Sequence, residues 1–87
     1  MQNVKTQNIL MKQTNSRLLI FRTDIKTQKK VNALKQLFNS HINIIDWSVD
    51  LEDIDNVLWI NASEQLAESD VINLIKPKGF YCDALAD

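Results

Sequence analysis

The sequence predicts an α+β fold of four strands and two helices in the order β-α-β-β-α-β. Three features predict it: two short apolar runs bounded by polar residues, two stretches with helical periodicity, and one stretch of strict alternation. With 87 residues, of which 45% are hydrophobic and 24% charged, the chain has the length and composition of one small globular domain. We assign residues 17–87 to that domain, and residues 1–16, which are polar and aperiodic, to a flexible N-terminal tail.

The first part of the domain is predicted to be a strand followed by a helix. Residues 17–22 (RLLIFR) form an apolar run with arginine at both ends, which is typical of a central strand. Apolar residues then recur at helical spacing, which predicts a helix over 27–39 with Asp24 or Thr27 as its N-cap. The apolar stripe of this helix consists of Val31, Leu34, Leu37 and Phe38.

A hairpin is predicted to follow this helix. Ile45 and Trp47 belong to a stretch over 42–51 in which apolar and polar residues alternate, so this strand buries one face. The acidic segment 52–56 is a turn, and 57–60 (VLWI) is the next strand. Since that strand has apolar residues on both faces, one apolar pair must lie on the sheet face that no helix covers.

A second helix and a short strand end the domain. Apolar residues from 66 to 75 have helical spacing, and the helix ends at Lys76 because Pro77 cannot continue it. Gly79, the only glycine, suits a left-handed turn before a last strand that begins at Phe80. This order predicts a ferredoxin-like sandwich, an antiparallel sheet of order 4-1-3-2 with both helices on one face. The expected core is Leu34, Leu37, Phe38, Ile45, Trp47, Val71 and Ile75.

Charge is distributed unevenly, although the net charge is only −1. Residues 1–45 contain eight lysines and arginines against one aspartate, a net +7, whereas residues 46–87 contain two against ten acidic residues, a net −8. Either the two halves neutralise each other within one fold, or the chain presents a basic face to an acidic partner or associates with itself head to tail. A pI near 5.7 argues against nucleic-acid binding, and no apolar run approaches the roughly 18 residues of a membrane helix.

Catalytic and cofactor motifs are absent from the sequence. One histidine, one cysteine and one glycine do not make a nucleophile triad, a phosphate loop or a dinucleotide fingerprint. We therefore expect no enzyme activity and no cofactor. Cys82 cannot form an internal disulfide, which suits the cytoplasm, and we expect it to pack in the core. His41 is expected at the end of the fold opposite to Asp24 and Thr27.

Several positions match the sequence pattern of a known family. Val31 stands where the signature M-x-C-x-x-C-x-x-x-V has its valine, and Gly79-Phe80 takes the place of a Gly-Tyr before the last strand. The segment WSVDLEDIDNVLWI also looks like the strand-turn-strand of relatives without a metal site. From about Arg17 to Leu85, the chain thus resembles the heavy-metal-associated domains of copper chaperones and metal-transporting ATPases.

The metal ligands of that family are replaced in this sequence. The two cysteine positions of the signature fall on Asp24 and Thr27, and Arg22 replaces the methionine. Cu(I) is a soft ion that prefers thiolates, and a carboxylate and a hydroxyl are hard ligands. The resemblance therefore implies the scaffold of a metal chaperone, and the residues predict that no metal binds to it.

Lysines surround the replaced ligand positions. The predicted topology brings the start of the first helix and the loop before the last strand to one end of the fold. The resemblance implies that lysines beside this loop help to dock an acidic partner, unless the carboxylates of the acidic turn neutralise them. The candidate partner or anion surface consists of Lys26, Lys29, Lys30, Lys76 and Lys78.

These observations lead to one main functional hypothesis and two alternatives. The main hypothesis is a small non-catalytic interaction or regulatory module on a metal-chaperone-like scaffold. The alternatives are a transition-metal binding or trafficking protein with a non-standard site, and an accessory subunit of an enzyme. We also expect a weak homodimer through the uncovered apolar strip, framed by Arg17, Arg22 and the acidic groups of the strand over 42–51.

Overall fold

A computed structural model describes residues 16–85 and shows six regular elements and one short 3₁₀ turn. The predicted tail, residues 1–16, lies outside the described residues except for Ser16, which begins the first strand. No helix within residues 16–85 is long and apolar enough to span a membrane. The elements are β1 (Ser16–Thr23), α2 (Gln28–Asn39), β2 (Ile44–Val49), β3 (Leu58–Ser63), α3 (Glu68–Ile75), η1 (Lys76–Lys78) and β4 (Cys82–Ala84).

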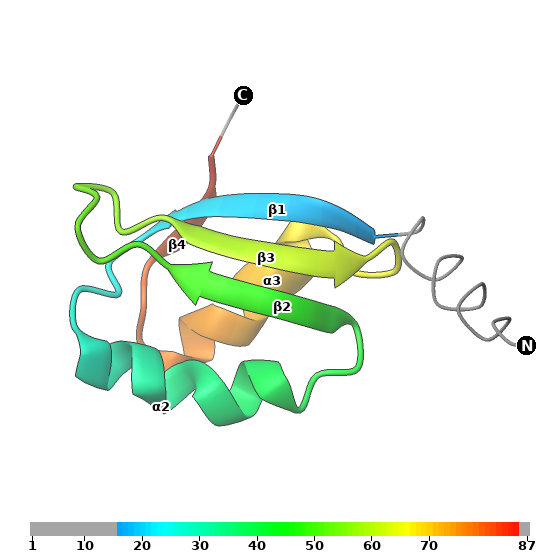
Figure 1. Cartoon of the computed structure of the whole chain (residues 1–87), viewed down its shortest axis with the longest axis horizontal. Helices are drawn as coiled ribbons and strands as arrows, with labels where there is room; N and C mark the ends of the chain where they lie inside the picture. Colours follow the sequence, from blue (N-terminus) through cyan, green and yellow to red (C-terminus); the bar gives the residue numbers. More distant parts are fainter. Residues whose placement is uncertain (1–15, 86–87) are drawn as a thin grey trace, which may run out of the picture.

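The four strands form one antiparallel sheet in the order β2-β3-β1-β4, which confirms the predicted ferredoxin-like topology. Both helices pack against the same face of this sheet and leave the other face uncovered (Figure 1). β1 is a central strand, as its apolar run predicted, because it pairs with β3 on one side and with β4 on the other.

The core lies between the sheet and the two helices. β1 contributes Leu19 and Phe21, α2 contributes Leu34 and Phe38, and α3 contributes Ile75 together with Val71. Burial of these side chains is the main stabilising term in a domain of this size. The predicted stripe of the first helix is thereby confirmed, although Leu37 is only partly buried.

The prediction that Ile45 belongs to the core is wrong, because β2 contains a bulge. Ile44 pairs with Ala62 and Asp46 pairs with Asn61, so Ile45 is an extra residue between two consecutive pairs. Its side chain is 56% exposed. Trp47 does face the helices, where it packs edge-on against Phe38 with ring centroids 4.9 Å apart, but it is only partly buried.

Element boundaries differ from the predictions where pairing or capping decides them. β3 continues past the predicted 57–60 to Ser63 because it pairs with β1 as far as Ser16. α3 begins only after Ala67, whose backbone N–H donates to Asp70 Oδ2 at 2.8 Å. β4 begins at Cys82, two residues later than predicted. Gly79 has φ +92°, as expected of the left-handed turn after the helix.

Arg17 does not frame the uncovered sheet face, contrary to the prediction. Its guanidinium donates to the backbone carbonyl of Leu66 at 3.0 Å, on the side of the sheet where the helices lie. Leu66 is itself buried and lies ahead of α3, although its spacing had suggested the helix. Arg17 therefore ties the start of β1 to the loop between β3 and α3.

Candidate functional site

Three loops meet at one end of the domain (Figure 1). They are the β1–α2 loop over 24–27, the β2–β3 loop over 50–57 and the segment over 76–81 that leads into β4. Two hydrogen bonds hold them together: Thr23 N–H, at the end of β1 directly before the first loop, donates to the carbonyl of Asp55 at 3.0 Å, and Tyr81 N–H donates to Asp24 Oδ1 at 2.8 Å. The β1–α2 loop is thus fastened on both sides.

Thr23 is the buried polar residue at the centre of this arrangement. Its hydroxyl donates to the carbonyl of Asn56 at 2.6 Å and accepts from the N–H of Ile25 at 3.1 Å. Ile25 is fully buried, and Asn56 has a positive φ of 43°. The hydroxyl of Thr23 therefore fixes the strand end, the loop and the neighbouring hairpin loop relative to one another.

Asp24 and Thr27, the residues at the expected ligand positions, both accept backbone hydrogen bonds. Thr27 is the N-cap of α2 and accepts from Lys30 N–H at 3.2 Å, so the choice between the two predicted caps falls on Thr27. Asp24 accepts from Tyr81 instead. Each side chain thus has a structural role in shaping the loop.

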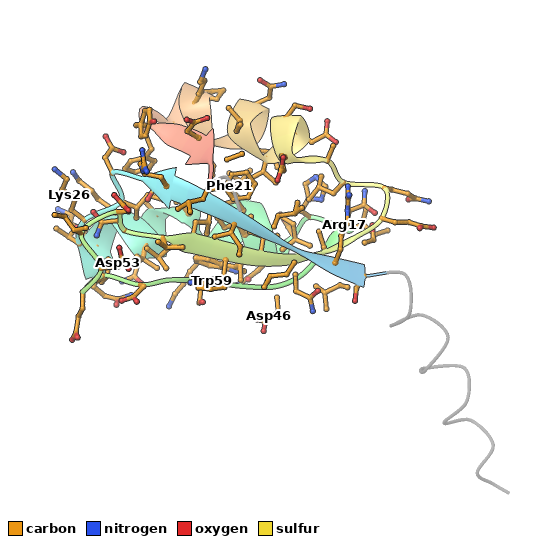
Figure 2. The ribbon with its side chains drawn as sticks, turned by 90° about the horizontal axis from the view of Figure 1, so that it is seen from above. Arg17, Phe21, Lys26, Asp46, Asp53 and Trp59 are labelled. Carbon is orange, nitrogen blue, oxygen red and sulfur yellow. The ribbon has the colours of Figure 1, made fainter. Side chains whose placement is uncertain are left out.

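The five predicted lysines lie on two segments, the β1–α2 loop with the first turn of α2 and the segment over 76–81, and all are exposed. Lys26 lies in the loop, Lys29 and Lys30 lie in the first turn of α2, and Lys76 and Lys78 lie in η1. The hydrogen bond between Asp24 and Tyr81 joins these two segments. We call this surface the lysine end. Figure 2 shows Lys26 at the end of the domain opposite to Arg17.

Acidic residues of the β2–β3 loop lie at the same end, as Asp53 shows in Figure 2. Asp50 accepts from the backbone N–H of Glu52 at 3.0 Å, and Asp53 accepts from that of Asp55 at 2.8 Å. Asp55 forms an ion pair with Arg22 Nε at 3.5 Å, and this is the one ion pair within 4.0 Å among residues 16–85. The loop carboxylates therefore do not pair directly with the lysine end in the described part of the chain.

Neither His41 nor Cys82 acts at these loops: His41 lies at the opposite end of the fold, and Cys82 is buried. His41 follows α2 at the opposite end, where its Nδ1 accepts from Asn43 N–H at 3.1 Å and it lines an open pocket of about 350 Å³. Cys82 is only 3% exposed, as predicted for a core cysteine. Burial raises the pKa of the Cys82 thiol to about 12, with a further rise from Asp83 and a smaller opposing effect of Lys76. Within residues 16–85, no three His, Cys, Asp or Glu side chains form a group that could hold a metal ion.

Comparisons with known proteins give structural matches only. No protein-family model and no curated protein matches the sequence. The apo form of the HMA domain of a copper chaperone for superoxide dismutase is 20% identical, with a TM-score of 0.69, over 82% of this chain and 68% of that one. A CsoZ metallochaperone is 14% identical, with a TM-score of 0.66, over 78% of this chain and 97% of that one.

This chain has the fold of a heavy-metal-associated domain. The resemblance predicted from Val31 and Gly79-Phe80 is confirmed at the level of fold, and both structural neighbours are described as chaperones. In this heavy-metal-associated fold, Asp24 and Thr27 are the first and last residues of the β1–α2 loop, beside the lysine end.

Two residues that shape the site do so through partners that the sequence does not predict. The hydroxyl of Thr23 reaches Asn56, 33 residues away, and nothing local indicates this contact. Arg22, predicted to frame the open sheet face, also pairs with Asp55. One signal was available for Thr23: a polar β-branched residue directly after an apolar strand is well suited to a buried backbone contact.

Proposed function

We propose that this chain is a non-catalytic protein-interaction module, of a regulatory kind, that docks an acidic partner protein through its lysine end. One observation supports this most strongly: five exposed lysines from two segments lie at one end of the fold, and none forms an ion pair within residues 16–85. The lone, buried cysteine is compatible with a reducing compartment, and we place the protein in the cytoplasm.

The position of the lysines makes a purely structural role a poor explanation. Lys29 and Lys30 lie in the first turn of α2, which contains no acidic residue. The positive end of the helix dipole disfavours cations there, at a cost of about 0.3–1 kcal/mol each at low salt. An acidic partner would remove this repulsion on docking. The neighbouring carboxylates of the β2–β3 loop would repel basic surfaces and so add specificity.

Charge reversal at the lysine end is expected to weaken capture of the partner. Immobilised full-length chain would be incubated with native lysate, and the proteins retained would be identified and quantified. Lys29→Glu is expected to lower the affinity for the specific partner about three- to fivefold, which corresponds to about 0.6–1 kcal/mol. Addition of Lys78→Glu should lower it further, and higher salt should release the partner.

Lys35→Glu is the matched control because Lys35 is also exposed and also lies on α2, but nearer its C-terminal end. This variant should retain the partner nearly as well as the wild-type chain. If the two reversals on α2 weakened capture equally, or if neither did, the lysine end would not be the docking surface.

We further propose that the module binds no transition metal, since Asp24 and Thr27 accept backbone hydrogen bonds and Cys82 is buried. Calorimetric titration of the reduced chain with Cu(I) and with Zn(II) is expected to show no stoichiometric binding in the micromolar range. Cys82→Ser should give the same result. Tight binding that disappears in Cys82→Ser would overturn this part of the proposal and favour a metal-trafficking role with a non-standard site.

A further inference from the structure

The face of the sheet away from the helices, here called the open face, exposes apolar side chains. Leu18 on β1 is 54% exposed and Trp59 on β3 is 40% exposed, with the partly buried Ile20 opposite Trp59. In Figure 2, Phe21 lies on the α3 side of the sheet and Trp59 on the other side. The open face is therefore an apolar surface distinct from the lysine end.

The charges on this face are placed symmetrically about Trp59. Trp59 pairs with Ser48 on β2 and with Ile20 on β1. Asp46 lies on the neighbouring strand β2, one outward-facing position from Trp59 towards the end of β3, beside Asn61. Arg22 lies on the other neighbouring strand, β1, one outward-facing position from Trp59 towards the start of β3. An acidic and a basic side chain thus stand on opposite sides of a central tryptophan.

Such an arrangement is complementary to itself. A two-fold axis that lies in the plane of the interface and passes through Trp59 exchanges the positions of Asp46 and Arg22. With strands roughly 4.8 Å apart and outward-facing residues roughly 6.8 Å apart along a strand, the strands of two copies would cross at roughly 70°. This angle is close to the orthogonal class of sheet packing.

We propose that two copies of this chain associate weakly through their open faces, with Trp59 on the two-fold axis and Asp46 of each copy against Arg22 of the other. The apolar side chains supply the attraction. The charges mainly fix the orientation, because Arg22 also pairs with Asp55 and lies opposite Asp83. The Arg22 side chain is still 52% exposed, and its ion pair uses Nε, so a guanidinium with five donors can meet another carboxylate.

The open face is small compared with stable protein interfaces. The outward-facing positions of β2, β3 and β1 cover roughly 300 Å² per copy at these spacings. Stable protein interfaces bury about 800 Å² per partner. We therefore expect only a weak association, so that the chain is a monomer when dilute and forms dimers at high micromolar concentration.

Sedimentation equilibrium of the full chain tests this inference. Between about 10 and 500 µM, the weight-average mass is expected to rise from 10.0 kDa towards twice that value. Trp59→Thr and Leu18→Thr should each abolish the rise, because threonine suits a strand but removes apolar area. Ile42→Thr and Ile54→Thr are the controls, since these isoleucines are 91% and 94% exposed but lie outside the sheet, and both should dimerise like the wild-type chain.

Charge reversal tests the orientation. Asp46→Lys should weaken the dimer about three- to tenfold, and Asp53→Lys, in the β2–β3 loop, should not. Circular dichroism would confirm that every variant is folded. A monomer at all concentrations would overturn the inference, as would dimers that persist in Trp59→Thr. In a Trp47→Phe background, fluorescence quenching by iodide reports on Trp59 alone. If Trp59 were equally protected from iodide at low and at high protein concentration, the inference would also fail, because the chain itself would then cover the open face.

Discussion

Replacing Phe38 by alanine is expected to lower the free energy of unfolding by about 3–5 kcal/mol. Phe38 is fully buried between α2 and the sheet, and its ring also packs edge-on against Trp47 at an interplanar angle of 69°. The substitution would create a cavity in the single core of a small domain, whose total stability is of order 5–15 kcal/mol. Urea denaturation followed by circular dichroism would measure the loss.

Ile54→Ala is the control for Phe38→Ala. Ile54 is an apolar residue that is 94% exposed in the β2–β3 loop, so its truncation should change stability by less than about 0.5 kcal/mol. If Phe38→Ala cost under about 1 kcal/mol, the packing of α2 on the sheet would have to differ from that described here.

The second large effect is expected at Thr23. Thr23→Val keeps the shape of the side chain but removes the hydroxyl, which leaves the carbonyl of Asn56 and the N–H of Ile25 without their partner. Buried polar groups without hydrogen bonds cost about 1–3 kcal/mol each, so a loss of about 2–6 kcal/mol is expected for the two groups. Amide hydrogen exchange should also accelerate at Ile25, because the β1–α2 loop loses its internal tie.

Thr23→Ser separates the hydroxyl from the rest of the side chain. Serine can make both hydrogen bonds and lacks only the methyl group, so this variant should lose less than Thr23→Val and should keep the slow exchange at Ile25. A larger loss in Thr23→Ser than in Thr23→Val would show that packing of the methyl group, and not the hydroxyl, holds the loop.

Local signals in the sequence were sufficient for the fold. The apolar run of β1 predicted a central strand, the spacing of Leu34 and Phe38 predicted the buried face of α2, and Gly79 marked the left-handed turn. Each of these depends on residues close together in the chain, where periodicity and backbone preference act directly. The strand order followed because few topologies suit this order of elements.

The bulge in β2 shows where periodicity fails. The alternation predicted that Ile45 would be buried with Trp47, but one extra residue after Ile44 turns Ile45 outward. The pattern of apolar and polar residues along β2 does not reveal the bulge, because the bulge is visible only in the register with β3. A bulge is a property of a strand pair, and neither strand alone encodes it.

The sequence by itself determined the element order, the helix faces, the burial of Cys82 and the presence of lysines at one end of the fold. Only the tertiary structure decided which polar side chains bond to which distant backbone groups. Asp24 meets Tyr81 across 57 residues of chain, Thr23 meets Asn56 across 33, and Arg17 meets Leu66 across 49. Such bonds have geometric tolerances of a few tenths of an ångström, whereas sequence periodicity shows only on which face of a helix or strand a residue lies. The shape of the lysine end therefore depends on long-range hydrogen bonds, while the scaffold that presents it is defined by local patterns.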